Sequence, residues 1–184
     1  MKESFEIAIT KNFSLEDLKH GLYLFVFRAT RIPPHLGIIT DGKLYDISLQ
    51  GPNTDIPVEE FYQTVSKRNS EVVFIELKKP MLSGFLDDEM KRLVNEYWKV
   101  SKEVSCLAPI KDLIGRNYNL EAVEQAHFLF ELLPILESNK LIKSTVQLNL
   151  DNKLNNNVLS LKKYTKEDIE NCINALQRKE QHAC

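Results

Sequence analysis

Hydrophobic and polar residues in the first half of the chain follow the patterns of β-strands. Residues 5–10 alternate between apolar and polar side chains, as a half-buried strand does, and residues 22–27 form an unbroken apolar run. A run of this length, rich in aromatic and branched side chains, is typical of a strand that is buried on both faces. We therefore expect a sheet with residues 22–27 near its middle.

An Asp-Gly pair at positions 41–42 predicts a hairpin beside that strand. The pair lies between residues 36–40 and 43–49, and Asp-Gly between two apolar runs is among the strongest short hairpin signals. The segments that follow are predicted to be a loop at 51–57, a short helix at 58–66 and a strand at 71–77.

From residue 87 onward the apolar residues recur at helical spacing. The predicted helices cover residues 87–104, residues 107–114 with Gly115 at the end, and residues 120–137 with a kink or an end at Pro134. Residues 144–150 and 158–161 are expected to pair as a hairpin, and residues 165–168 to cap a final helix.

These elements together predict an α+β fold in which an antiparallel sheet packs against helices. We expect one domain over residues 1–142 and a hairpin-helix appendage over residues 143–184. The chain has 184 residues, of which 43% are hydrophobic and 27% charged, a balance that supports a folded core and excludes two large domains.

Charge and hydropathy limit the kinds of partner that the protein can bind and the cellular locations that we expect for it. The chain has 24 Lys and Arg residues against 26 Asp and Glu, a net charge of −2 that argues against a nucleic-acid partner. No apolar run is long enough for a transmembrane segment, and the acidic N-terminal sequence is unlike a signal peptide. We therefore expect a cytoplasmic protein.

The sequence gives no sign of a metal, a cofactor or a disulfide scaffold. The three cysteines, at positions 106, 172 and 184, form no Cys-x-x-Cys pair. No glycine-rich phosphate loop or dinucleotide fingerprint is present. Arg28 and Arg31 could bind a carboxylate or phosphate, or they could simply be solvated surface cations.

Cys106 is the residue with the clearest chemical potential. Ser105 precedes it as a possible N-cap and Pro109 follows, and proline is tolerated in a helix only in the first turn. This pattern predicts that Cys106 lies at a helix N-terminus, where the helix dipole favours the reactive thiolate. The alternative is a small buried hydrophobic residue, a common environment for free cysteine.

A nucleophilic cysteine needs a base and a group that orients the base. His20 and His182 lie in polar segments and His127 in a predicted core helix, whereas His35 begins a strand directly after a loop. A hairpin turning at residues 41–42 places Asp46 diagonally across from His35, within reach of its ring. The alternatives are a loop histidine that covers the strand end and a solvent-facing aspartate.

These residues resemble a family of known proteins. His35-Leu-Gly-Ile-Ile, then Leu44-Tyr-Asp46, and much later Ser105-Cys106 look like the motifs of circularly permuted papain-like domains of the NlpC and lecithin:retinol acyltransferase type. The resemblance covers residues 20–116. It implies a permuted papain-like fold, with Cys106 as nucleophile, His35 as general base and acid, and Asp46 in the orienting role.

The resulting expectation is a thiol-dependent hydrolase or acyltransferase, such as a cysteine amidase or peptidase, acting on an amide or ester in a small-molecule, peptide or lipid substrate. The alternative is a non-catalytic binding or assembly module on the same scaffold, with Cys106 buried. The long apolar segment 120–136 also leaves open an oligomer or a subunit of a larger complex.

Overall fold

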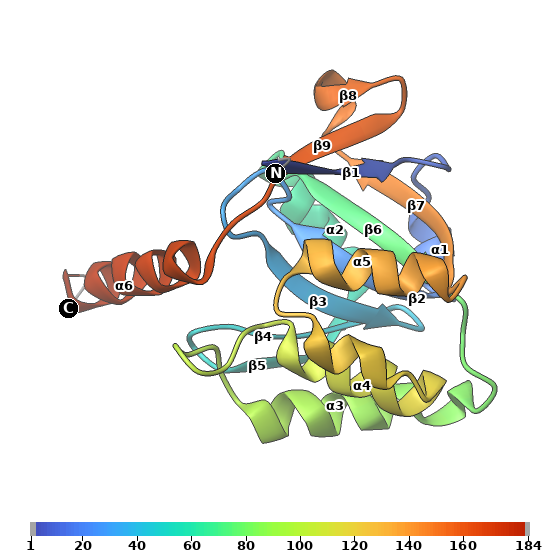
Figure 1. The fold of residues 1–184 in the computed structure, drawn as a ribbon, viewed down its shortest axis with the longest axis horizontal. Coiled ribbons are helices and arrows are strands. Elements are labelled where there is room, and N and C mark those ends of the chain that lie inside the picture. Colours follow the sequence, from blue (N-terminus) through green and yellow to red (C-terminus); the bar gives the residue numbers. More distant parts are fainter. Residues whose placement is uncertain (1–2, 183–184) are drawn as a thin grey trace.

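The structure, a computed structural model, describes residues 3–182 and contains two antiparallel sheets (Figure 1). In the larger sheet the strand order is β5-β4-β3-β2-β6-β7, and in the smaller it is β1-β9-β8. The strands of the larger sheet are β2 (Leu22–Phe27), β3 (His35–Thr40), β4 (Lys43–Ile47), β5 (Pro52–Pro57), β6 (Val72–Leu77) and β7 (Ile142–Leu148). Those of the smaller sheet are β1 (Ser4–Ala8), β8 (Leu154–Asn155) and β9 (Val158–Lys162).

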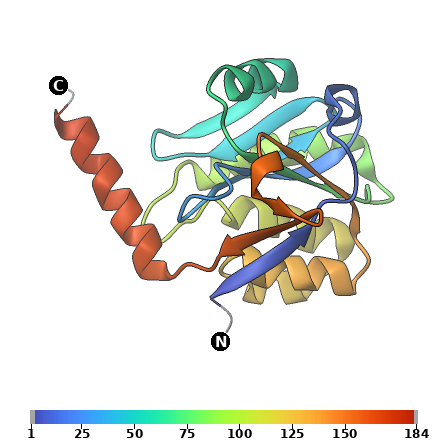
Figure 2. The same cartoon turned by 90° about the horizontal axis from the view of Figure 1, so that it is seen from above.

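Helices cover both faces of the larger sheet. The covering helices are α1 (Leu15–Leu18), α2 (Val58–Lys67), α3 (Leu86–Tyr97), α4 (Ala108–Tyr118) and α5 (Leu129–Ser138). The last helix is α6 (Lys166–His182), and 3₁₀ turns lie at Ser83–Phe85, Glu121–Gln125 and Asp151–Lys153. The helix α6 projects to one side of the body in both views (Figures 1 and 2).

Two apolar clusters, one on each face of the larger sheet, form the core. The larger cluster joins one face of β2, β3 and β6 to buried residues of α3, α4 and α5 and of the small sheet. The smaller cluster joins the other face to α1 and α2. The central strand β2 supplies side chains to both, which explains why its sequence is apolar without alternation.

The predicted α+β class, with antiparallel strands packed against helices, is confirmed. The strand at 22–27 lies between β3 and β6, and the hairpin at Asp41-Gly42 forms with Thr40 opposite Lys43. The final helix begins at a capping box, in which the Asp168 N–H donates to the Thr165 hydroxyl at 3.2 Å and the Thr165 N–H donates to the Asp168 carboxylate at 2.7 Å.

The loop predicted at residues 51–57 is wrong, because Pro52–Pro57 form β5, the edge strand beside β4. Proline cannot donate to a ladder, but an edge strand tolerates it. The predicted hairpin between residues 144–150 and 158–161 is also wrong. The strand β7 pairs with β6 and β9 pairs with β1, so both segments found partners distant in sequence.

Three predicted helix boundaries are wrong as well. The helix predicted to residue 104 ends at Tyr97, and Trp98 at φ 67° turns the chain away. Gly115 lies inside α4, which continues to Tyr118 and is capped by left-handed Asn119. The helix expected over 120–137 is a 3₁₀ turn followed by α5, which contains Pro134 without ending there.

Within residues 3–182, no helix has the length and apolar character needed to cross a membrane. The cytoplasmic location and the division of the chain at residue 142 stay predictions.

Candidate active site

His35 stands at the first position of β3, at the end of the loop that follows β2. The ladder pairs it with Phe27, the last residue of β2. The ring of His35 lies beside that of Phe25, with 6.3 Å between ring centroids, and 31% of its side chain remains exposed. The sheet therefore holds one side of the imidazole and leaves the other accessible.

The hairpin brings Asp46 to this ring. The register of β3 and β4 pairs Ile38 with Tyr45, which places Asp46 next along β4, on the side facing the start of β3. The Nε2 atom of His35 lies 3.0 Å from Oδ2 of Asp46, and only 8% of the Asp46 side chain is exposed. The two-residue turn thus fixes the geometry of the pair through the register that it imposes.

Gly37 makes the close approach of these side chains possible. Gly37 lies two residues after His35 in β3, so the two positions face the same side of the sheet. It lies between the Phe25 ring and Asp46. A Cβ atom at this position would lie 2.4 Å from the Phe25 ring and 2.8 Å from Cβ of Asp46. The glycine therefore leaves the space that the aromatic ring and the carboxylate occupy.

Asn53 holds the carboxylate from the other side. Its register partner in the β4–β5 ladder is Asp46, and its Nδ2 donates to Oδ1 of Asp46 at 2.6 Å. One carboxylate oxygen thus faces His35 and the other faces Asn53. Sequence reasoning missed Asn53 because the flanking prolines predicted a loop, although short proline-bounded segments are also typical of edge strands.

Cys106 lies in the turn directly before α4, and its side chain is half-buried. Pro109 occupies the first turn of the helix, as predicted, but the N-cap is Leu107 rather than Ser105 and makes no side-chain hydrogen bond. Ser105 acts through its backbone carbonyl, which accepts from the Ala108 N–H at 3.0 Å. Among the described residues, the backbone N–H of Cys106 has no hydrogen-bond partner.

Cys106 lies close enough to the His35 ring to influence its charge. Burial by itself lowers the pKa of His35, but the hydrogen bonds to Asp46 and Cys106 and the negative charge of both groups outweigh it and raise that pKa to about 10. Nε2 is the ring nitrogen that faces Asp46. The three predicted residues are therefore neighbours in the fold.

Tyr164 lies near Cys106, a neighbour that sequence reasoning did not identify. It is buried against Phe128 and Phe130, and its hydroxyl accepts from the Leu129 N–H at 3.5 Å. Burial raises the pKa of Tyr164, and the charge of the nearby Cys106 raises it further, so the phenol stays neutral. Tyr164 lies two residues after the end of β9, and its proximity to Cys106 arises from long-range packing that leaves no local signal in the sequence.

The remaining candidates lie elsewhere. His127 is exposed in the loop before α5, so the prediction of a packed helical histidine is wrong. His20 pairs with Glu16 at the exposed end of α1. Over residues 3–182, no three His, Cys, Asp or Glu side chains are grouped in a way that could hold a metal ion.

Comparisons with known proteins add nothing to this geometry: no protein-family model, no curated protein and no solved structure matches the chain.

Proposed function

We propose that this protein is a thiol-dependent hydrolase or acyltransferase that acts on an amide or ester, with Cys106 as nucleophile, His35 as proton carrier and Asp46 as the residue that positions His35. The observation that carries the proposal is the proximity of a half-buried sulfur to an imidazole whose Nε2 lies 3.0 Å from a buried carboxylate. This arrangement has the parts that an activated cysteine requires.

The raised pKa of His35 supports an ion-pair mechanism. At neutral pH the ring carries a proton. The proposed nucleophile is the sulfur of Cys106 as thiolate, the reactive form of cysteine. The thiolate attacks the carbonyl carbon of the substrate, and the carbonyl electron pair moves to its oxygen. The unpartnered N–H of Cys106, at the start of α4, is available to donate to that oxyanion.

Collapse of the tetrahedral intermediate breaks the bond to the leaving amine or alcohol. The proton on Nδ1 of His35 goes to that leaving group, and a thioester remains on Cys106. In the second half-reaction, neutral His35 accepts a proton from water or from another acceptor, which attacks the thioester carbon. The sulfur leaves as thiolate, and the imidazolium is restored.

The order of these residues along the chain supports a permuted papain-like architecture for the site. The histidine begins one strand, the carboxylate follows on the next strand, and the cysteine comes later, before a helix. This is the order of the NlpC and lecithin:retinol acyltransferase type that the sequence resembles.

Acylation by p-nitrophenyl acetate tests the proposal without knowledge of the natural substrate. We expect a burst of nitrophenolate and an acetyl group on Cys106, detected by intact mass and peptide mapping. Cys106→Ala should abolish both, with little change in the denaturation midpoint. Cys172→Ala is the matched control, since Cys172 is also a free, half-buried cysteine, and it should leave the burst intact.

Labelling with iodoacetamide across pH separates an enzyme from a binding module. A thiolate at Cys106 should react rapidly at neutral pH. An inert Cys106 in the folded protein, or a burst that persists in Cys106→Ala, would contradict the proposal.

A further inference from the structure

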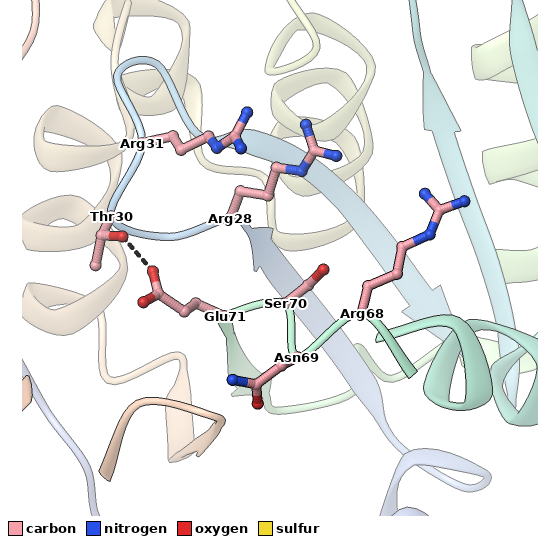
Figure 3. Close-up of a pocket in the computed structure, with 7 residues that line it drawn as sticks. All are labelled: Arg28, Thr30, Arg31, Arg68, Asn69, Ser70 and Glu71. Atoms are coloured by element: carbon pink, nitrogen blue, oxygen red, sulfur yellow. Dashed lines mark hydrogen bonds between the residues drawn. The ribbon is translucent and has the colours of Figure 1, made fainter. Parts of the chain in front are cut away.

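A pocket of about 340 Å³ opens where the loop after β2 meets the end of α2. It is lined by Arg28, Thr30, Arg31, Arg68, Asn69, Ser70 and Glu71 (Figure 3). The loop continues into His35, and Val72, which follows Glu71, pairs with Phe27. The pocket therefore lies at the same end of the sheet as the candidate active site but includes none of its three residues.

The three arginines of the pocket have no carboxylate partner among the described residues, although the chain has only six arginines and a net charge of −2. The one acidic residue that lines the pocket is occupied elsewhere. Glu71 pairs with Lys153 and accepts a hydrogen bond from Thr30, and Figure 3 shows its carboxylate directed towards Thr30 and away from the guanidinium groups. The pocket thus keeps the charge of three guanidinium groups.

The backbone around these arginines is fixed by hydrogen bonds. The Arg31 N–H donates to the Arg28 carbonyl at 2.8 Å, the Ala29 N–H donates to the Glu71 carbonyl at 3.2 Å, and the Arg68 N–H donates to the Thr64 carbonyl at 3.1 Å. The Arg28 guanidinium also lies over the Phe27 ring, 5.2 Å from its centroid. These contacts hold two segments, distant in sequence, with their cationic ends around one space.

The charges of Arg31 and Arg68 repel that of Arg28. Burial lowers the pKa of its guanidinium, and the charges of Arg31 and Arg68 lower it further. All three side chains are exposed, so water and salt reduce this repulsion without removing it. An anion bound among the three arginines would be attracted by all of them.

We propose that Arg28, Arg31 and Arg68 form a binding site for a phosphate group. Guanidinium groups bind phosphate oxygens through paired N–H donors, and three of them match a dianion with several acceptor oxygens better than they match a single carboxylate. The volume of the pocket leaves room for a phosphate that carries an organic substituent. The free hydroxyl of Ser70 provides a further donor at the pocket wall.

The site is tested by calorimetric titration of the full chain with inorganic phosphate at low ionic strength. We expect saturable binding, and a loss of at least about tenfold in affinity for each of Arg31→Gln and Arg68→Gln, since hydrogen bonds to charged groups are strong. Arg178→Gln is the matched control, because it removes the same charge from exposed α6 without touching the pocket, and it should change affinity less than about twofold. Circular dichroism melting curves establish that each variant is folded.

Two further titrations identify the source of the phosphate. Glycerol 3-phosphate represents a free organic phosphate, and vesicles containing phosphatidic acid, compared with vesicles of phosphatidylcholine alone, represent a lipid headgroup. Binding of either that is weakened by Arg31→Gln but not by Arg178→Gln supports the site and names its source. Absence of binding by all three phosphates, equal loss in Arg178→Gln, or acetate binding as tightly as phosphate would overturn the proposal.

Discussion

Two histidines of this protein each face a carboxylate at nearly the same distance, yet their surroundings differ. His20, just after α1, lies 3.2 Å from Glu16, and 75% and 69% of the two side chains are exposed. His35 and Asp46 are 3.0 Å apart on the β3–β4 hairpin, with 31% and 8% exposed. An exposed pair of the first kind contributes little, because water and salt screen it.

The difference lies in what else each pair contacts. The carboxylate of Asp46 accepts from Asn53, and the ring of His35 also meets Cys106, whereas the pair on α1 adds only an ion pair between Glu16 and Lys19. Burial strengthens the electrostatic coupling within the His35 group. Of these two pairs, only the buried one lies beside a cysteine, and this is what makes it the candidate for function.

Replacing His35 and His20 in turn should give the largest difference between the two pairs. We expect His35→Ala to slow acylation of Cys106 by p-nitrophenyl acetate by roughly 10²- to 10⁴-fold, the usual range for loss of a proton-transfer group. His20→Ala should retain the wild-type rate, because His20 contacts only Glu16 at the surface. Stopped-flow release of nitrophenolate measures both, and equal rates in the two variants would break the distinction.

Asp46→Asn should lower the pKa of His35 from about 10 towards its ordinary value near 6.5, by about one to three pH units, because an opposite charge beside the ring is lost. The alkaline limit of the acylation rate, where the imidazolium is lost, should move to lower pH by the same amount. NMR titration of the His35 ring measures the shift directly. An unchanged alkaline limit would contradict the assigned role of Asp46.

Asp46→Asn should also change how the stability of the fold depends on pH. Because the pKa of His35 is raised in the folded protein, its contribution is fully present below about pH 6.5 and is lost as the pH rises through about 10. The free energy of unfolding of the wild type, measured with urea, should therefore fall between about pH 6.5 and pH 10. The fall should be smaller in Asp46→Asn.

Gly37→Ala should destabilise the fold by about 1–3 kcal/mol, since its methyl group would enter the space of the Phe25 ring and Asp46. Gly84→Ala is the matched control, because a Cβ there would meet nothing within 4 Å, and its effect should stay within about 0.5 kcal/mol. Urea denaturation followed by fluorescence of Trp98 compares them. Similar midpoints would show that the hairpin accommodates a side chain at position 37.

The smallest expected effect is that of Asn53→Ala. It removes one hydrogen bond to Asp46, which contributes about 0.5–1.5 kcal/mol. The alkaline limit of the acylation rate should move in the same direction as in Asp46→Asn, but less. A shift as large as that of Asp46→Asn would mean that Asn53, rather than the charge of Asp46, controls His35.

The hairpin half of the candidate site could be predicted from the sequence because local rules govern it. Asp41-Gly42 fixes a two-residue turn, the turn fixes the register, and the register places Asp46 beside the start of β3. Pro109 likewise predicts the start of α4 near Cys106. Each inference involves residues within one turn or one hairpin.

The remainder depends on packing between distant segments. The approach of Cys106 to His35 requires α4 to dock on the sheet, and no spacing rule gives that placement; only the family resemblance suggested it. Tyr164 comes near Cys106 because β9 pairs with β1 and not with residues 144–150, the hairpin partner expected from the sequence. Asn53 was missed because its prolines obscured an edge strand.

The two halves of the site are held together by different kinds of contact. The imidazole and its carboxylate belong to one hairpin, whereas the sulfur is carried by a turn that docks from the helical layer. A local opening that lifts this layer while the hairpin stays closed would separate Cys106 from His35. The proposed acylation of Cys106 would then report on the docking of the two layers, and mild denaturant should lower its rate before secondary structure is lost.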